Sequence, residues 1–441
     1  MSGPASTACI VQADSQDRTM VFSVLFAVLV ALMGLGITAA FIASGPWAWS
    51  LGLMWVGYDA LLQMVLVATA WGAVRRGQPI AGGGAGPSLA VLVPARNEVS
   101  VLPATIAALM PQLGPLDQLL VVDDGSTDGT AAWCAAHEVN CLSKPNSGKS
   151  DSLNQALNSV SEDIIVTIDA DTVVLPGSLT AIRTAFAADP LLVAAGGVLT
   201  TTYRPAPLAR WLAWHQQAEY VRSFLFRAAW DRWRTLLLVS GAFAAYRRAE
   251  LVAIGGYDRG CLVEDYEITH RLHRALPDRH VGMIPGAQAI TDVPGKVSTF
   301  LAQRSRWFAG FIQVHFHYRA MVGDRRYGAL GLLMLPLKTV DLLLPLAGLM
   351  ALLILVGLLV VGTAVDPLIF LVIGGKLVLD LLLVVIILRL TARWTGKQQS
   401  TWSVVIATMC EPLAYQPLRQ IGALLGWIAH LRRRHTWTPQ R

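Results

Sequence analysis

Long apolar stretches flank a central region in which apolar and polar positions alternate in short runs. The apolar stretches are almost free of charge: residues 20–74 carry only Asp59, and residues 342–388 carry only Asp366, Lys376 and Asp380. About 20 consecutive apolar residues suffice for a helix to cross a bilayer. The pattern therefore predicts a transmembrane hairpin over 20–76 and two further membrane segments over 341–362 and 368–388.

The last apolar stretch, residues 402–431, is interrupted by Glu411, Pro412 and Pro417. A crossing here would carry the arginines at 432–434 to the outer face, although basic residues tend to stay on the cytoplasmic side. We therefore expect an interfacial or re-entrant segment with a cytoplasmic C-terminus. A third crossing is the alternative.

Between the membrane blocks, short apolar runs alternate with helical patterns. Strands are expected at LAVLVPA (89–95), QLLVVDD (118–124) and DIIVTIDAD (163–171), and helices at 99–112, 130–137 and 149–160. Apolar strands that alternate with helices form a mostly parallel sheet with helices on both faces. We therefore predict an α/β domain whose ligands collect at the carboxyl ends of the strands.

These patterns divide the chain into six segments. They are a cytoplasmic tail (1–19), the transmembrane hairpin (20–76), a Gly/Pro-rich linker (77–88), a cytoplasmic domain (89–296), an interfacial amphipathic helix (297–326) and a C-terminal membrane region (327–441) with two secure membrane segments and one uncertain one. The amphipathic helix combines aromatic and arginine side chains, as a helix lying in the membrane surface does.

Composition supports this division. Of the 441 residues, 54% are hydrophobic and 15% charged, whereas a soluble domain averages about 25% charged residues. The net charge of +6 arises from arginines beside the apolar stretches, which indicates contact with anionic lipid and cytoplasmic placement; no nucleic-acid partner is expected. The five cysteines form no CxxC pair, which argues against a disulfide framework or a zinc site and fits a reducing cytosol.

Acidic residues gather at the predicted strand ends. Asp123 and Asp124 close one strand, and Asp169 and Asp171 close another. Hard carboxylate oxygens in this arrangement suit Mg²⁺ or Mn²⁺ bridging a diphosphate. Lys149 stands at a predicted helix start, where an ammonium and free N–H groups could meet a phosphate.

A series of motifs makes a family resemblance specific. It comprises VPARNE (93–98), VVDDGSTDGT (121–130), NSGKSDSLNQAL (146–157), DAD (169–171), VSGAFAAYRR (239–248), VED (263–265) and QRSRW (303–307). This series resembles the processive family 2 glycosyltransferases, which are membrane synthases of cellulose, chitin, hyaluronan and poly-N-acetylglucosamine. The resemblance implies a glycosyltransferase A-type domain inserted between N- and C-terminal transmembrane helices.

The resemblance also implies roles for the acidic and basic positions. Asp123 and Asp124 match aspartates that contact the base and ribose of the nucleotide, and Lys149 matches a lysine beside the diphosphate. Asp169 and Asp171 match the DxD motif that binds ribose and metal, so Mg²⁺ or Mn²⁺ is the expected cofactor. Glu264 and Asp265 complete a motif usually written TED, in which Val263 replaces the threonine here. Asp265 would be the catalytic base.

Gln303, Arg306 and Trp307 match the QxxRW signature of processive synthases. By this resemblance Arg306 neutralises the diphosphate and Trp307 stacks on the acceptor sugar, as guanidinium and indole chemistry allow. The alternative is that these side chains anchor an amphipathic helix to lipid. The terminal segment HTWTPQR (435–441) resembles the Thr-Trp-containing end of poly-N-acetylglucosamine synthases. The resemblance implies that Trp437 would reach the active site.

The expected function is single-step, inverting transfer from a UDP-sugar to a growing polysaccharide, which then passes through the membrane. The narrower expectation is poly-N-acetylglucosamine made from UDP-N-acetylglucosamine at the inner (plasma) membrane, with the catalytic domain in the cytoplasm. A small membrane accessory subunit is a further possible partner. Hyaluronan, chitin-type and glucan synthases are alternatives, as is a non-processive transferase that acts on a lipid acceptor.

Overall fold

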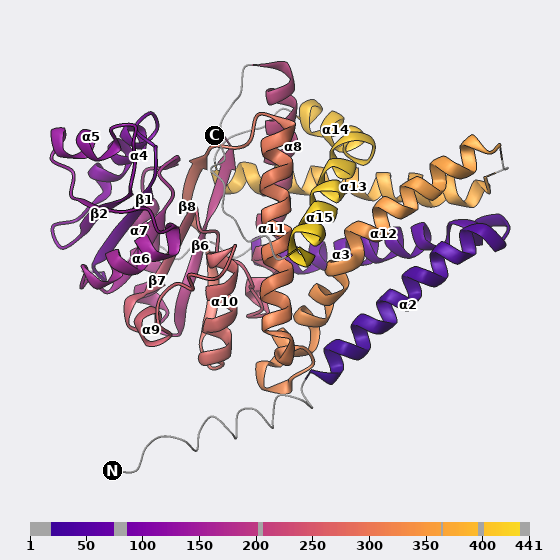
Figure 1. Ribbon diagram of the computed structural model, residues 1–441, viewed down its shortest axis with the longest axis horizontal. Coiled ribbons are helices and arrows are strands. Elements are labelled where there is room, and N and C mark those ends of the chain that lie inside the picture. The colour runs from indigo at the N-terminus through magenta and orange to yellow at the C-terminus, as the bar shows by residue number, and fades with distance from the viewer. Residues whose placement is uncertain (1–18, 75–85, 202–205, 363–364, 396–400, 433–441) are drawn as a thin grey trace, which may run out of the picture. The chain divides into compact units, whose positions relative to one another are not determined.

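The computed structural model describes residues 19–74, 86–201, 206–362, 365–395 and 401–432 (Figure 1). The chain forms two compact units. The first comprises Met1–Ala68, Ser298–Ile386 and Ser400–Arg441, and the second comprises Thr69–Val297 and Ile387–Gln399. Most of the predicted tail (1–19), most of the predicted linker (77–88) and the segment 435–441 with Trp437 lie outside the described residues.

The second unit is built on a sheet. Over the described residues it has eight strands in the order β3-β2-β1-β4-β7-β6-β8-β5. The strands are β1 (Leu89–Ala95), β2 (Gln118–Asp124), β3 (Cys141–Lys144), β4 (Ile164–Ile168), β5 (Thr172–Val174), β6 (Leu192–Thr201), β7 (Phe243–Arg247) and β8 (His280–Thr291).

Helices cover both faces of this sheet, as Figure 1 shows. They are α4 (Leu102–Leu109), α5 (Thr130–Ala136), α6 (Lys149–Asn158), α7 (Ser178–Ala188), α8 (Pro207–Arg232), α9 (Arg248–Ala253) and α10 (Glu264–Ala275), with a short 3-10 turn η2 (Met110–Gln112) after α4. One core of buried aliphatic and aromatic side chains fills the space between helices and sheet.

The three strands predicted from apolar runs are confirmed. β1 and β2 have the predicted bounds, and β4 occupies the first part of the third run. β1 lies between β2 and β4 and is parallel to both. These strands are buried on both faces, which is why they read as continuous apolar runs and not as alternating ones.

The sheet is parallel at one end and mixed at the other. β7 is antiparallel to β4 and to β6, and β5 is antiparallel to β8, whereas β6 and β8 run parallel. The antiparallel pairing of β7 has a direct effect on the carboxyl edge of the sheet. It brings the segment before β7 beside the end of β4, where the Asp169 N–H donates to the Ala242 carbonyl at 3.3 Å.

The first unit is helical. It contains α2 (Met20–Ile42), η1 (Gly45–Trp49), most of α3 (Ser50–Val74) and of α11 (Val297–His317), the short turns η3 (Arg319–Met321), η4 (Arg325–Tyr327) and η5 (Leu330–Met334), α12 (Leu335–Val360), most of α13 (Pro367–Thr395), α14 (Thr401–Cys410), η6 (Glu411–Tyr415) and α15 (Gln416–Leu431). Among the described residues, three helical stretches are long and apolar enough to cross a membrane: Met20–Ile42, Leu330–Val360 and Pro367–Ile386.

Within the apolar helices α3 and α13, the described Asp59, Lys376 and Asp380 side chains are paired. Lys376 Nζ lies 2.5 Å from Asp380 Oδ1 on the same helix, as the four-residue spacing predicts. It also lies 2.7 Å from Asp59 Oδ2, so α3 and α13 share one ammonium. Gln63 Nε2 donates to the same Asp59 oxygen at 2.7 Å. The link from Asp59 to Lys376 joins residues 317 positions apart and is not readable from local spacing.

The stretch 402–431 stays helical through its prolines. The chain passes from α14 to α15 through η6, a π-helical turn at Glu411–Tyr415. In a π turn the hydrogen bonds span five residues instead of four, so the helix widens locally without ending. Whether the stretch crosses the membrane or lies along it stays a prediction.

Candidate active site

The carboxyl edge of the parallel half of the sheet gathers most of the acidic positions singled out in the sequence. Asp123 and Asp124 end β2, and Asp169 follows β4 directly. The chain turns at Asp169, whose carbonyl accepts a 2.9 Å hydrogen bond from the Thr172 N–H. Asp169 and Asp171 therefore lie on a turn at the strand end, where ligands of α/β sheets bind.

Lys149 connects two of these acidic motifs. It is the first residue of α6, after Gly148 at the N-cap, as the sequence predicted. Its Nζ lies 2.7 Å from Asp169 Oδ1 and 3.0 Å from Glu264 Oε1. Burial alone would lower the pKa of Lys149, but the charges of Asp169 and Glu264 outweigh it and hold the pKa well above its ordinary value. The ammonium is therefore a permanent cation at this edge.

Asp265 is fixed by backbone hydrogen bonds. Its Oδ2 accepts from the Gly241 N–H at 2.9 Å, and its Oδ1 accepts from its neighbour Tyr266 N–H at 2.8 Å. Burial raises the pKa of Asp265, and the adjacent Glu264 carboxylate raises it further; the Gly241 N–H and Lys149 oppose this rise. A carboxylate with a raised pKa is a stronger proton acceptor than an ordinary aspartate.

Glu264 and Asp265 both lie in the first turn of α10. The positive end of the helix dipole favours carboxylates in this turn. Glu264 points its carboxylate at Lys149, whereas Asp265 is bound to Gly241. Glu264 therefore contacts the Lys149 ammonium, and the oxygens of Asp265 are held by backbone N–H groups.

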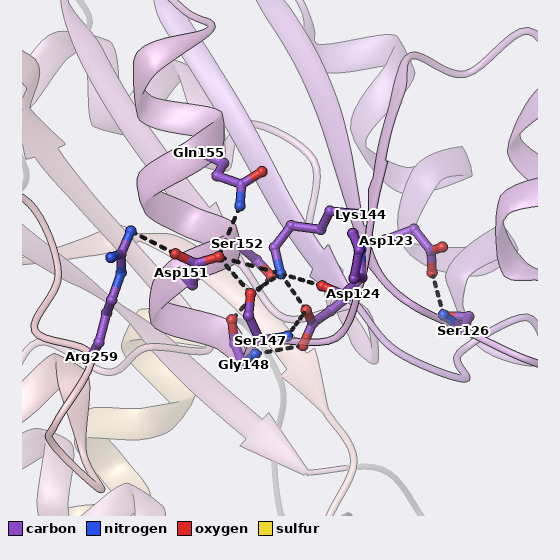
Figure 2. A network of polar contacts seen from close by, with 11 residues as sticks. Asp123, Asp124, Ser126, Lys144, Ser147, Gly148, Asp151, Ser152, Gln155 and Arg259 are labelled. Atoms are coloured by element: carbon purple, nitrogen blue, oxygen red, sulfur yellow. Dashed lines mark hydrogen bonds and ion pairs between the residues drawn. The ribbon is translucent and has the colours of Figure 1, made fainter.

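Asp124 holds the loop that precedes Lys149 (Figure 2). Its Oδ1 accepts from the Ser147 N–H at 2.8 Å, and its Oδ2 accepts from the Gly148 N–H at 2.9 Å. It also forms a buried ion pair with Lys144, the last residue of β3. Parallel pairing of β2 with β3 sets Asp124 opposite Lys144, so this contact follows from the sheet register.

The network in Figure 2 continues from Lys144 to Asp151 on α6. Asp151 also pairs with Arg259 at 2.6 Å and accepts from Gln155 Nε2 at 2.8 Å. The Ser147 hydroxyl, with help from Gln155 and Arg259, holds the pKa of Asp151 below its usual range. Sequence reasoning did not single out Lys144 or Asp151, because neither belongs to a recognised acidic or basic pair along the chain.

Asp123 has a different environment from its neighbour. It is 4% exposed, and its Oδ1 accepts from the Ser126 N–H at 3.2 Å. Figure 2 shows its side chain directed away from the Lys144 network, toward the Ser126 turn. The two adjacent aspartates of the VVDDGS motif therefore have separate structural partners.

Arg227 is a cation near the site that no sequence motif marks. It lies on α8, with its guanidinium carbon 4.8 Å from the centre of the Phe224 ring. Burial lowers its pKa to about 10, while attraction from Asp265 and Tyr220 opposes that fall. Arg227 therefore remains charged at neutral pH and acts on the Asp265 carboxylate. The sequence did not indicate a role for Arg227, because the residue lies in an aromatic-rich helix and belongs to no charged motif.

The DxD acids provide two oxygen-donor side chains. Mg²⁺ sites in nucleotide-binding proteins use one or two carboxylates and complete their coordination with substrate phosphates and water. The described residues contain no group of three or more His, Cys, Asp or Glu side chains placed for a metal. The two carboxylates of Asp169 and Asp171 fit a divalent ion that a diphosphate would help to hold.

Gln303, Arg306 and Trp307 lie on α11 in the helical unit. Gln303 is 5% exposed, whereas Arg306 and Trp307 are half-buried. Arg306 and Trp307 follow Gln303 by one helical turn, so the three side chains are neighbours on the helix surface. Their predicted roles toward donor and acceptor stay predictions.

Comparison with known proteins supports the fold and the class of domain. The family described as "Glycosyl transferase family 2" matches residues 90–253. An N-acetylglucosaminyltransferase of Sinorhizobium fredii is 29% identical over 262 residues, which cover 52% of this chain and 58% of that protein. A poly-beta-1,6-N-acetyl-D-glucosamine synthase of Staphylococcus epidermidis is 24% identical over 228 residues, covering 50% of this chain and 54% of that protein.

Among solved structures, a mannosyltransferase of Pyrobaculum calidifontis in complex with GDP-mannose and Mn²⁺ is similar in fold. The TM-score is 0.53 at 19% identity, and the similarity covers 83% of this chain and 99% of that one. The chain spans about half the length of the curated relatives it matches. The sheet order, the helices on both faces and the family match together show a glycosyltransferase A-type fold, and the chain carries a glycosyl transferase family 2 domain.

Proposed function

We propose that this protein is an inverting, processive hexosyltransferase that polymerises a β-linked polysaccharide from a UDP-sugar and passes the product across a membrane. The polymer we propose is poly-N-acetylglucosamine, made from UDP-N-acetylglucosamine. The arrangement of Lys149 between Asp169 and Glu264, beside the Gly241-bound Asp265, carries the proposal. In this proposal the arrangement supplies a fixed cation, acids that would hold a metal and an aspartate that would accept a proton.

The donor's nucleotide and diphosphate would bind along this edge. Asp124 has both oxygens engaged with the loop before Lys149, so it holds that loop in place. Asp123, whose side chain is separate from that network, is therefore the better candidate for contact with base or ribose. Lys149 would bind the diphosphate by charge, as a lysine at a helix start does. Asp169 and Asp171 would hold Mg²⁺ or Mn²⁺, which offsets the charge on the departing diphosphate when bound.

Asp265 would act as the general base. An acceptor hydroxyl gives its proton to Asp265 as its oxygen bonds to the anomeric carbon, and the bond from that carbon to the diphosphate breaks. UDP leaves with the bonding electron pair, and attack from the opposite side converts an α-linked donor into a β-linkage. General-base assistance of this kind contributes about 10²–10⁴-fold to the rate. Glu264 supports the site by fixing Lys149.

The QRSRW helix would provide the acceptor side of the reaction. We propose that Arg306 binds diphosphate oxygens, that Trp307 stacks on the terminal sugar, and that Gln303 assists in acceptor binding. Guanidinium groups bind phosphate oxygens in a bidentate manner, and indole faces suit the apolar C–H face of a pyranose. The opposing hypothesis, that these residues only anchor α11 to lipid, predicts no effect of Trp307 on product length.

Placement in the membrane rests on the apolar helices. Three described stretches are long and apolar enough to cross a bilayer. We propose a multi-pass protein of the inner (plasma) membrane with the glycosyltransferase domain in the cytoplasm, where nucleotide sugars are made. The names of the relatives support an N-acetylglucosamine polymer. We propose that this polymer serves as an exopolysaccharide in biofilm formation. A small membrane accessory subunit is part of the same proposal.

The decisive experiment measures UDP release by the purified full chain in lipid nanodiscs with Mg²⁺ or Mn²⁺. UDP-N-acetylglucosamine, UDP-glucose and UDP-glucuronate are offered singly and in pairs, and the products are sized on a gel. We expect a long product from UDP-N-acetylglucosamine alone that a β-1,6-specific hexosaminidase digests. Asp265→Asn serves as the catalytically inactive control.

Other outcomes separate the alternatives. A product that requires another donor or a donor pair would identify a glucan, chitin-type or hyaluronan synthase with the same chemistry. Transfer of a single sugar to lipid would show a non-processive enzyme. No UDP release from any donor, either alone or with a co-expressed membrane partner, would contradict the proposed activity.

A further inference from the structure

Arg304, the second residue of QRSRW, is buried against the tryptophan of the same motif. Its guanidinium carbon lies 4.4 Å from the centre of the Trp307 ring and 4.8 Å from that of Phe300. Arg304 is 7% exposed and Phe300 is fully buried, so a largely buried guanidinium lies over two aromatic rings of α11. A cation over an indole face is attracted by the ring's quadrupole, most strongly where water is excluded.

A residue of the C-terminal helical stretch also contacts this guanidinium. Arg304 Nη2 donates to the Tyr415 hydroxyl at 3.4 Å. Tyr415 is 1% exposed, and its ring centre lies 5.4 Å from that of Phe300. Tyr415 ends the π turn η6, immediately before α15 begins at Gln416. The side chain that stacks on Trp307 is therefore held by a residue 111 positions further along the chain.

Helix α15 lies against α11 at backbone contact distance. A methyl group on Gly422 would lie 2.6 Å from Arg304 Cβ, and one on Gly426 would lie 2.9 Å from Phe308 Cβ and from the Ser305 carbonyl oxygen. Side chains do not approach this closely, so only glycine is compatible with the observed packing. Small residues four apart on one helix are what such close helix contacts require.

We propose that Arg304 is a positioning residue for the acceptor, which covers one face of the Trp307 indole and is held in place by Tyr415 and by the glycines of α15. The opposite face of the indole is then presented in one orientation to a pyranose. This inference rests on the proposed role of Trp307 in acceptor binding. It gives the stretch 402–431 a task in acceptor binding that its apolar sequence does not reveal.

A fixed indole improves acceptor binding because the side chain does not have to be ordered when the sugar arrives. Removal of the guanidinium should therefore act on the acceptor and not on the donor. We expect Arg304→Gln to raise the KM for an acceptor oligosaccharide about 3- to 10-fold and to shorten the product, with the donor KM unchanged. Tyr415→Phe keeps the ring and removes only the hydroxyl, so it should shift acceptor KM in the same direction by less.

The test uses the full chain in nanodiscs, with UDP release measured against donor and acceptor concentration in turn. Arg319→Gln, an exposed arginine just beyond α11, is the matched control and should leave both KM values unchanged. In a Trp307→Ala background, Arg304→Gln should cause no further change in acceptor KM. A loss of kcat without a change in acceptor KM would overturn the proposal. Additive effects of the Arg304 and Trp307 substitutions on acceptor KM would also overturn it.

A second readout does not depend on activity. Fluorotryptophan is incorporated into the chain, and the ¹⁹F resonance of Trp307 is assigned by its loss in Trp307→Phe. Arg304→Gln and Gly422→Ala should shift that resonance, whereas Gly357→Ala, where a methyl group meets nothing within 4 Å, should not. An unmoved Trp307 resonance overturns the positioning role. A moved resonance in an enzyme without activity on any UDP-sugar would leave the positioning in place and contradict the proposed function instead.

Discussion

Gly241 donates its backbone N–H to Asp265 Oδ2 at 2.9 Å, and no side chain separates the two residues. A methyl group at position 241 would lie 3.3 Å from Asp265 Cβ, from Asp265 Oδ2 and from Lys149 Nζ. Contacts this short force the neighbours to move by a few tenths of an ångström. The absence of a side chain at Gly241 therefore positions both Asp265, the proposed base, and Lys149, the cation proposed to bind the diphosphate.

The first prediction follows from this contact. Gly241→Ala should lower kcat about 10- to 100-fold, because a small displacement of the reacting groups is costly to catalysis. The free energy of unfolding should change little, since flexible side-chain ends can adjust. Steady-state UDP release and thermal unfolding of the same preparation test this. A variant with wild-type kcat would show that Asp265 and Lys149 do not need their present spacing.

The pH dependence of activity tests the assignment of Asp265 as base. Its pKa is raised by burial and by Glu264, so the carboxylate accepts a proton at a higher pH than an ordinary aspartate does. Activity should therefore fall on acidification through that raised pKa, and Asp265→Asn should reduce kcat by about 10²–10⁴-fold while donor binding persists. The pH profile of kcat together with donor titration by calorimetry checks both parts.

The same pKa shift has a consequence for stability. A group whose pKa is higher in the folded state favours folding below its unfolded-state pKa, and this contribution disappears as the pH rises through the folded-state pKa. Above that pKa the folded protein holds a carboxylate that burial and Glu264 disfavour. Asp265→Asn should thus raise the unfolding temperature at pH 8 and not at low pH. An equal change at both pH values would contradict the raised pKa.

Lys144 should matter for both stability and donor binding. It pairs with the buried Asp124 and lies 3.5 Å from Asp151, so Lys144→Met would leave a buried carboxylate without its cation. Breaking a buried pair in this way costs about 3–5 kcal/mol. The Ser147–Gly148 loop would loosen, and the donor KM should rise. Denaturant unfolding and donor titration measure the two effects.

Arg259→Gln is the matched control for Lys144. Its side chain is 70% exposed although it lies 2.6 Å from Asp151. An exposed ion pair contributes less than about 1 kcal/mol, so this substitution should change stability little. If Lys144→Met were as mild as Arg259→Gln, the network in Figure 2 would not be what holds the loop.

The parts of the fold predicted from sequence are those with a strong local pattern. β1 and β2 are buried on both faces, so their apolar runs are continuous and their bounds are read directly. β6 and β8 were not predicted. β6 contains Gly196 and Gly197, which weaken a strand pattern, and buried and half-buried positions follow each other irregularly along the 12 residues of β8. The antiparallel placement of β7 depends on pairing between distant segments, which no local pattern carries.

The candidate site shows the same division. Lys149, Asp169 and Asp265 stood in recognisable motifs, and the structure brings Lys149 into contact with Asp169 and with Glu264. The contact of Asp124 with Lys144 arises from strand pairing, and that of Gly241 with Asp265 arises from the packing of α10 against the segment before β7; neither could be read from spacing. The VSGAF motif was identified in the sequence, but only the structure explains why its third position is glycine. Helix α10 approaches Gly241 so closely that a side chain there would crowd Asp265.

Metal dependence provides a further prediction. Asp169 and Asp171 supply two carboxylates, so the ion is expected to bind together with the donor and to be removable. EDTA should abolish UDP release, and added Mg²⁺ or Mn²⁺ should restore it. Asp171→Asn should raise the metal concentration required about tenfold, in line with the loss of one charged oxygen ligand. Full activity in EDTA would contradict a divalent cofactor.

The shared ammonium of Lys376 predicts coupling between two apolar helices. Lys376 Nζ contacts both Asp59 and Asp380, so Lys376→Met would remove the cation that both carboxylates share in apolar surroundings. An uncompensated charge at the centre of a membrane helix costs about 3 kcal/mol, and we expect a lower unfolding temperature in nanodiscs. Adding Asp59→Asn and Asp380→Asn to Lys376→Met removes those charges and should restore most of the lost stability. If the triple variant were no more stable than Lys376→Met, packing of the lysine stem and not its charge would account for the loss, because both variants carry the same methionine and differ only in the carboxylates.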